Sequence, residues 1–186
     1  MKKWILFFTL LLTGFSSHAF VIDSNVFYFT DDTESDTDNS NAVTSYTFFI
    51  GFNLDKKGRY QAGWNYTSDS TEDDLNGQKE EYSSTQMGPA FVYFLDKELT
   101  WRLYFAYNLK TTADFTPTSG AKEEWRGTSM IFNFGYQLAI SESFAVGVRL
   151  NYSSSDYDES VVGTTKEDVS FSKVMMYPSL AITLDL

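Results

Sequence analysis

The sequence predicts an all-β protein, an eight-stranded antiparallel up-and-down transmembrane β-barrel that follows a cleaved signal peptide. Three observations predict this fold. Apolar and polar residues alternate with a period of two over most of the chain, short turns alternate with long polar segments, and the apolar positions are rich in large aromatic residues. A period of two is typical of β-strands, and this order of connections is typical of a transmembrane barrel.

Residues 1–19 have the layout of a secretory signal peptide. A basic start is followed by an apolar run over Trp4–Leu12 and by the small residues Ser17 and Ala19 at a small-x-small site. The apolar run is shorter than the ~20 residues that a membrane-spanning helix needs. We therefore expect cleavage after this site and a single barrel domain over residues 20–186.

Eight segments carry the alternation and are predicted as strands. The first, about Ile22–Thr30, is less regular than the other seven. The predicted strands cover residues 22–30, 44–54, 60–67, 86–95, 99–110, 129–138, 144–153 and 173–186. Most of them are near the ~9–11 residues that a tilted strand needs to cross a bilayer.

The connections between the predicted strands alternate between short and long. Short turns are predicted at residues 55–58, 96–98 and 141–143, and long polar loops at about 31–41, 68–83, 111–126 and 154–171. Short turns on one side and long loops on the other are what an outer-membrane barrel shows. We therefore expect both termini in the periplasm and the acidic loops at the cell surface.

The apolar face is predicted to face lipid, because a barrel of eight strands is too narrow to hold so many large side chains. Small and polar residues suit such an interior, whereas a soluble barrel would place its apolar residues inside. Aromatic residues near both ends of the predicted strands also match the aromatic girdles of a membrane barrel. The predicted lipid-facing residues are Tyr46, Phe48, Ile50, Phe52, Trp64, Trp101, Phe132, Phe134, Val148 and Ile182.

The opposite face points into the barrel and is expected to fill it with polar side chains. Arg102 and Arg149 point inward, and a buried guanidinium without a partner is costly. Asp23 on the first predicted strand and Asp185 on the last are the inward acids at a similar height. We expect these four residues, with Gln137, to form a network that closes the lumen. The alternative for the same residues is a polar conduit.

An acidic run, DDTESDTDNS, places Asp32, Glu34, Asp36 and Asp38 at alternate positions. This spacing resembles the start of a calcium loop, but the glycine and the final glutamate of an EF-hand are missing at their positions. Carboxylate oxygens could still bind Ca²⁺ or Mg²⁺ weakly and bridge it to lipopolysaccharide phosphates. The simpler interpretation is a solvated acidic loop, so no cofactor is expected.

The composition argues against two classes of function. The formal net charge is −11, which argues against a nucleic-acid partner because little could neutralise phosphates. The only histidine, His18, lies in the predicted signal peptide, and the chain has no cysteine. Since much acid–base and nucleophilic catalysis depends on these residue types, we expect no enzyme activity.

A resemblance of pattern to a known family rests on three features. They are the alternating strands, the short turns and the C-terminal alternation of Leu180, Ile182, Leu184 and Leu186. On these features residues 20–186 resemble the small eight-stranded outer-membrane barrels of Gram-negative bacteria, the OmpA-transmembrane, OmpX and OmpW-like group. The family's C-terminal assembly signal ends in Phe or Trp, whereas this chain ends in Leu. The resemblance implies a place in the bacterial outer membrane, with membrane lipid, lipopolysaccharide and the barrel-assembly machinery as partners.

Three functions fit these observations. The first is a non-enzymatic outer-membrane barrel that presents acidic loops at the cell surface and has a plugged interior. The second is an OmpW-like narrow channel for small or apolar solutes, and the third is a soluble periplasmic binding barrel. Neither a ligand nor an oligomeric state is indicated by the sequence.

Overall fold

The structure, a computed structural model, describes residues 20–34, 38–75, 78–118 and 121–186, without the side chains at 32–34, 38–39 and 75. The predicted signal peptide lies outside these residues. No helix within the described ranges is long and apolar enough to cross a membrane.

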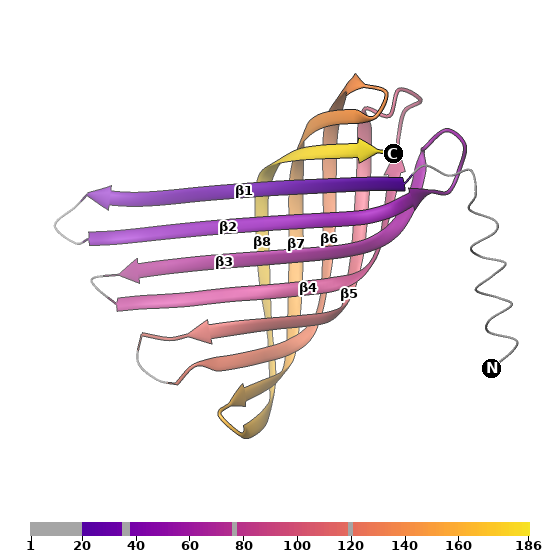
Figure 1. The fold of residues 1–186 in the computed structure, drawn as a ribbon. Helices are drawn as coiled ribbons and strands as arrows, with labels where there is room; N and C mark the ends of the chain where they lie inside the picture. The colour runs from indigo at the N-terminus through magenta and orange to yellow at the C-terminus, as the bar shows by residue number, and fades with distance from the viewer. Residues whose placement is uncertain (1–19, 35–37, 76–77, 119–120) are drawn as a thin grey trace, which may run out of the picture.

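Eight antiparallel strands form one closed ring in which each strand pairs with the next and β8 pairs with β1 (Figure 1). The strands are β1 (Phe20–Glu34), β2 (Asp38–Asn53), β3 (Tyr60–Leu75), β4 (Gln78–Phe94), β5 (Trp101–Thr116), β6 (Glu123–Ser141), β7 (Phe144–Val162) and β8 (Thr165–Asp185). The predicted eight-stranded up-and-down barrel is thereby confirmed. Figure 1 shows β1–β4 in front and β6–β8 crossing behind them at a steep angle, as expected where strands tilt to close a barrel.

The short turns and the C-terminus lie together at one end of the barrel, which we call the turn end. The carboxylate of Asp96 accepts hydrogen bonds from the backbone N–H groups of Thr100 and Trp101 at 3.0 and 2.8 Å. Desolvation acts to raise the pKa of Asp96, but these hydrogen bonds outweigh it and hold the pKa below its ordinary value. Asp55 accepts a hydrogen bond from the N–H of Tyr60 at 3.0 Å in the same way. Aspartate therefore closes two of the three short turns.

The strands are longer than predicted at the other end, which we call the distal end. The β3–β4 ladder continues to the pair Leu75 and Gln78, and the β7–β8 ladder continues to Val162 and Thr165. The prediction of four long loops is therefore wrong for most of their described residues, which are strand. Toward the distal end the outward face of the strands becomes mostly polar, so the alternation that marks a strand fades while the backbone ladder continues.

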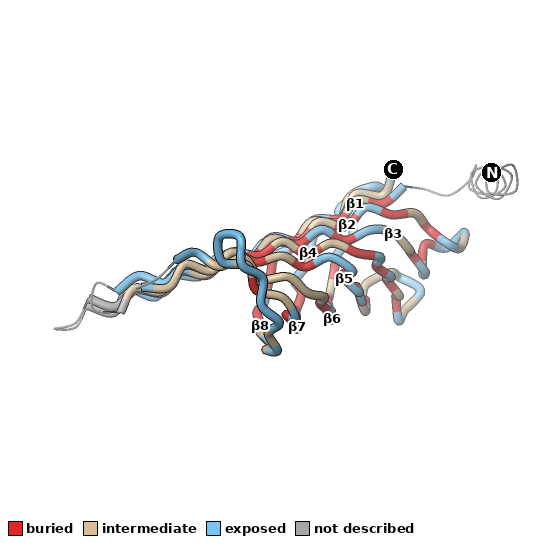
Figure 2. Tube along the Cα trace, turned by 90° about the horizontal axis from the view of Figure 1, so that it is seen from below, coloured by how far each residue is buried: buried red, intermediate tan, exposed pale blue. Residues whose placement is uncertain are grey.

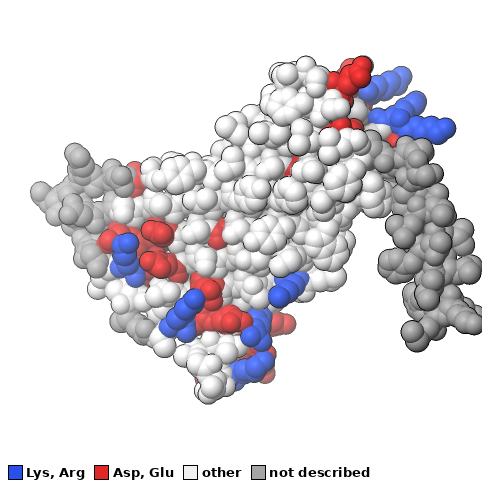
Figure 3. Space-filling model, in the orientation of Figure 1, with Lys and Arg blue, Asp and Glu red and all other residues white. Residues whose placement is uncertain are grey.

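Burial alternates along each strand between the inside and the outside of the ring (Figure 2). The outward positions carry large apolar side chains between two charged ends, and Figure 3 shows the charged side chains gathered toward those ends. We call this outward apolar surface the apolar band. The residues predicted to face lipid all lie on it, exposed or half-buried: Tyr46, Phe48, Ile50, Phe52, Trp64, Trp101, Phe132, Phe134, Val148 and Ile182.

The ring is closed by a short seam between its first and last strands. Among the described residues, β1 and β8 pair over Val21–Val26 and Leu180–Asp185, and Phe20 and Leu186 exchange two further backbone hydrogen bonds at the turn end. Pro178, two residues beyond the last pair, has no N–H group to donate to a neighbouring strand, so it favours an end of pairing there. The ring of Phe27 stacks on Tyr177 at a centroid distance of 5.2 Å where the two strands separate. Toward the distal end the wall is therefore unpaired along this seam.

Candidate functional site

A buried cluster of charged side chains lies inside the barrel toward the turn end. Nη1 of Arg102 on β5 lies 2.5 Å from Oδ2 of Asp23 on β1, and Nη2 of Arg149 on β7 lies 3.3 Å from the same oxygen. Thr183 donates a hydrogen bond to this oxygen at 2.6 Å, and Gln137 accepts one from Arg149 at 3.0 Å. The three charged side chains are at most 1% exposed. We call these five residues the charge cluster.

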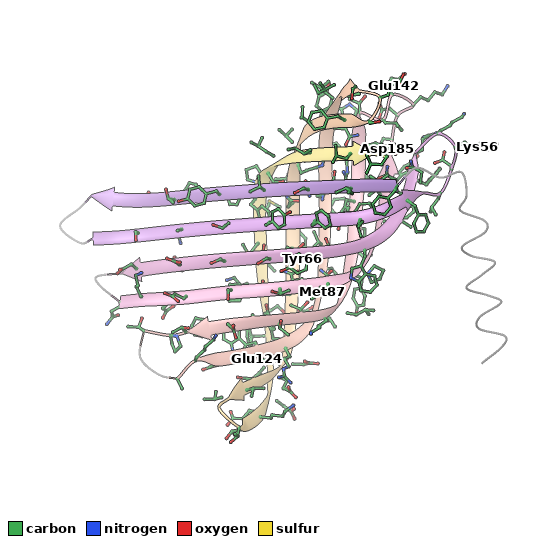
Figure 4. The ribbon with its side chains drawn as sticks, viewed as in Figure 1. Lys56, Tyr66, Met87, Glu124, Glu142 and Asp185 are labelled. Atoms are coloured by element: carbon green, nitrogen blue, oxygen red, sulfur yellow. The ribbon has the colours of Figure 1, made fainter. Side chains whose placement is uncertain are left out.

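The sequence predicts Asp185 in this network, but the structure places it elsewhere. In the β1–β8 register Asp23 is opposite Thr183, whereas Asp185 is opposite Val21. Asp185 therefore lies one inward position closer to the turn end, where Figure 4 labels it. Its carboxylate oxygens accept hydrogen bonds from Nδ2 of Asn53 at 3.3 and 3.4 Å. Thr183, a residue that the sequence did not single out, takes the place expected for Asp185.

Two glycines make room for Arg149. A methyl group at Gly135 would overlap the Arg149 side chain, and one at Gly147 would lie 2.6 Å from its Nη1. Gly135 is opposite Arg149 on one side and opposite Arg102 on the other. The absence of a side chain at Gly135 therefore lets the two guanidinium groups approach the same carboxylate.

Gly135→Ala is expected to lower the free energy of unfolding by about 1–3 kcal/mol, because overpacking would push Arg149 away from Asp23. Urea unfolding of the protein in lipid vesicles measures this change. Ser141→Ala, an exposed position on the same strand, serves as the control and should stay within about 0.5 kcal/mol of the wild type. Equal stability of both variants would show that Arg149 does not need this space.

Next to the charge cluster, an apolar core fills the turn end of the lumen. Phe49 is fully buried and meets the ring of Tyr104 edge-on at a centroid distance of 6.0 Å. Val21, Val92 and Phe94 belong to the same cluster and are at most 1% exposed. The expectation of a small and polar interior therefore needs correction at this end, where large apolar side chains help to close the barrel.

Further toward the distal end, a chain of hydrogen bonds crosses the lumen. Six side chains from β3, β4, β5 and β6 are joined head to tail, each donating to the next: Tyr104, Asn65, Asn108, Ser129, Gln86 and Asp69. Their donor–acceptor distances lie between 2.5 and 2.9 Å, and none of the six is more than 1% exposed. Hydrogen bonds in series polarise one another, which strengthens such a chain in a low-dielectric interior.

Some buried polar atoms of the lumen have no hydrogen-bond partner among the described residues. They include both amide atoms of Asn25 and of Asn133, Nε and Nη2 of Arg102, and Nε of Arg149. Buried polar atoms need partners, and water inside the lumen would supply them. The interior is therefore well filled with side chains but still favourable for water at these points.

At the distal end the inner faces of the strands carry an aromatic cluster. Phe115 stacks on Trp125 at a centroid distance of 4.8 Å, and Phe171 meets Trp125 edge-on at 4.5 Å. The hydroxyl oxygens of Tyr82 and Tyr157 lie 2.6 Å apart. This cluster brings β4, β5, β6, β7 and β8 together beyond the apolar band.

A cavity of about 440 Å³, which we call the distal chamber, opens beside this aromatic cluster. Charged residues line it together with the aromatic rings: Asp73, Glu80 and Glu81 from the β3–β4 hairpin, and Lys173 from β8. Nζ of Lys173 lies 3.2 Å from the centre of the Tyr82 ring, a cation–π contact. The chamber therefore combines an aromatic wall with a mostly acidic one.

The described part of the distal end is strongly acidic. Segments 69–75, 78–81, 110–118, 121–126 and 156–173 hold fourteen acidic and six basic residues. Figure 4 labels Glu124 at this end, far from the turn end. An excess of this size raises the local concentration of cations around the distal end.

The weak metal site expected in the acidic run stays a prediction. Asp36 lies outside the described residues, as do the side chains of Asp32, Glu34 and Asp38. Within the part of the chain that the structure describes, no group of three or more His, Cys, Asp or Glu side chains could hold a metal ion.

The barrel is similar to solved structures of bacterial proteins. Neisserial surface protein A (NspA) matches with a TM-score of 0.51 and 13% sequence identity, over 90% of this chain and 97% of that chain. The translocator domain of the autotransporter NalP from Neisseria meningitidis has a TM-score of 0.44 and 13% identity, over 98% of this chain and 68% of its own. The beta domain of the Bordetella autotransporter BrkA has a TM-score of 0.37 and 10% sequence identity, over 90% of this chain and 98% of that chain.

No family model matches the chain, and no curated protein matches it either. The likeness that carries weight is the one to NspA, and at 13% identity it concerns the fold. The chain has the fold of a small eight-stranded antiparallel barrel of the kind seen in that Neisserial surface protein.

Proposed function

We propose that the chain is a non-enzymatic integral protein of the bacterial outer membrane. The observation that carries this proposal is a closed ring of strands with a large apolar surface outside and a hydrogen-bonded polar interior. Exposing such an apolar surface to water is unfavourable, whereas contact with lipid is not. A closed ring also gives most backbone N–H and C=O groups a hydrogen-bond partner within the bilayer. The apolar band then faces lipid, the turn end faces the periplasm and the distal end faces outward from the cell.

The extent of the apolar band supports a membrane location. Each strand exposes large apolar side chains on its outer face; Leu180 is 66% exposed, Val148 53% and Phe105 45%. Soluble monomers rarely expose contiguous apolar patches larger than about 300–600 Å². A soluble periplasmic barrel would instead turn these residues inward.

The contents of the lumen support a closed interior. Eight strands leave a space that side chains can fill. The apolar core, the charge cluster and the six-membered chain of hydrogen bonds all lie in it, and Tyr104 belongs to both the apolar core and the chain. The proposed role is therefore that of a surface protein whose distal end meets the outside, and not that of a wide pore.

The acidity of the distal end suggests how it meets the cell surface. Lipopolysaccharide phosphates carry the same sign of charge, so Ca²⁺ or Mg²⁺ would be needed to bridge the two. Membrane lipid, lipopolysaccharide and the barrel-assembly machinery are the proposed partners. Catalysis is not proposed, because the chain has no cysteine and its only histidine lies in the predicted signal peptide.

A narrow channel for small or apolar solutes is the second candidate function. It is favoured by the unpartnered polar atoms of Asn25, Asn133 and Arg102, which suit a hydrated path. The unpaired seam beyond Val26 and Leu180 offers a second route, through the wall. Both routes would need a rearrangement of the filled lumen.

Conductance in planar lipid bilayers distinguishes the two functions. The wild-type protein should show little or no steady conductance, and the double variant Arg102→Ala/Arg149→Ala should show more because it removes two large side chains from the lumen. Arg126→Ala, an arginine at the distal end with a 43% exposed side chain, is the matched control and should behave like the wild type. A large wild-type conductance that the double variant leaves unchanged would favour the channel.

A further inference from the structure

The distal chamber contains an electrostatic conflict that the closed-barrel function does not explain. Asp73 on β3 and Glu80 on β4 are directly opposite each other in the register, both at inward positions. Like charges directly opposite on one face of a sheet are destabilising. Asp73 accepts a hydrogen bond from Nδ2 of Asn41 and is attracted by Lys173 on the other side of the chamber, but neither carboxylate takes part in a salt bridge with another described residue. The pair therefore suits a positive group placed between the hairpin and the chamber.

The chamber already accommodates one ammonium group, that of Lys173. Its Nζ lies against the face of Tyr82, and Tyr82 and Lys173 both line the cavity. Aromatic faces attract ammonium groups, more strongly where water is partly excluded. The contact of Lys173 with Tyr82 therefore shows that an ammonium group can pack against an aromatic face in this chamber.

The aromatic wall provides a surface for an apolar body. Phe115, Trp125 and Phe171 are half-buried in a part of the barrel whose outward face is mostly polar. A volume of about 440 Å³ falls in the range of cavities that bind small molecules. The acids lie on the β3–β4 hairpin and the rings on β5, β6 and β8, so one ligand can reach both.

We propose that the distal chamber binds small organic cations that carry an aromatic ring. The ring packs against Phe115, Trp125 and Phe171, and the ammonium group lies toward Asp73 and Glu80. The acidic distal end attracts such ligands and disfavours anions of the same shape. This binding does not require the lumen to conduct or the barrel to be oriented in a cell.

Three probes of similar shape test the proposal: phenethylamine, 2-phenylethanol and 3-phenylpropionate. Their binding to the purified protein in phosphatidylcholine vesicles is measured by titration calorimetry, with protein-free vesicles as the baseline. The amine should bind at least about tenfold more tightly than the alcohol, because it gains charge-assisted contacts, and the carboxylate should bind least. Equal binding of the three probes, or preference for the carboxylate, would overturn the proposal.

Variants locate the site. Trp125→Leu should weaken binding of the amine, whereas Trp101→Leu, the same change on the apolar band, should leave it unchanged. Asp73→Asn/Glu80→Gln keeps the shape of both side chains and should remove the preference for the amine over the alcohol. Folding of each variant is checked by its change of gel mobility on boiling. Amine binding that survives both chamber variants would overturn the proposal.

Discussion

Asp23→Ala is expected to lower the free energy of unfolding by about 3–5 kcal/mol, the cost of leaving a buried charge without its partner. Asp23 is the carboxylate that both Arg102 and Arg149 contact in the charge cluster. Removing it leaves two guanidinium groups buried beside each other, and Thr183 loses its shorter hydrogen bond, at 2.6 Å, and keeps the one to Gln137 at 3.5 Å. Denaturant unfolding in vesicles, followed by tryptophan fluorescence and by gel mobility without boiling, measures the loss.

Two further variants make this result specific. Asp23→Asn keeps the shape and an acceptor oxygen but removes the charge, so its effect should be smaller than that of alanine. Asp158→Ala, at an exposed position of β7, should change stability by less than about 0.5 kcal/mol. If Asp23→Ala were as mild as Asp158→Ala, the charge cluster would not hold the barrel together.

Phe132→Arg is the second change with a large expected effect, a loss of about 2–4 kcal/mol for a charge near the midplane of a lipid-facing wall. Phe132 is 44% exposed and lies between Phe105 and Tyr152 in the ladders of β6 with its two neighbours. In a soluble barrel the same change would replace an exposed apolar side chain by a charged one and would cost little.

The depth dependence of this cost provides the control. Ser70→Arg introduces the same charge on an outward position of β3 beyond the apolar band, where the cost should be about 0–1 kcal/mol. The amount of each variant that shows a boiling-dependent gel shift in cell envelopes measures its assembly. Equal assembly of the two arginine variants would argue against lipid around Phe132.

The strands and their two faces could be predicted because lipid and a narrow lumen impose opposite demands on alternate residues. Along β2 the outward residues Phe48 and Ile50 differ clearly from the inward Thr47 and Gly51. Phe49 is a large apolar residue at an inward position, where the alternation predicts a small or polar one, because it packs in the apolar core at the turn end. Gly51 gives it space, since a methyl group there would lie 2.5 Å from the Phe49 ring.

The inward partners could be predicted only as far as strand register allowed. Asp23, Arg102, Arg149 and Gln137 lie on inward positions that the alternation indicates, and the structure brings them together. Asp185 has the same parity but lies one inward position away, because nothing in the sequence fixes how β8 slides along β1.

The distal chamber could not be predicted from the sequence for a related reason. Its rings come from segments that read as polar loops, where each aromatic residue stands alone among charged and hydroxyl residues. Tyr82, Phe115, Trp125, Tyr157 and Phe171 become a cluster only because the ladders continue beyond the apolar band. Isolated aromatic residues in every long polar segment but the first are the signal that could have indicated it.

Topology in intact cells tests the central proposal most directly. Because the chain has no cysteine, single changes of two exposed lysines, Lys122→Cys at the distal end and Lys56→Cys at the turn end, each create one labelling site. A membrane-impermeant maleimide should label the Lys122→Cys variant on intact Gram-negative cells, and the Lys56→Cys variant only after the outer membrane is permeabilised. Labelling of neither site before permeabilisation, with release of the protein by osmotic shock, would contradict the membrane barrel and identify a soluble periplasmic one.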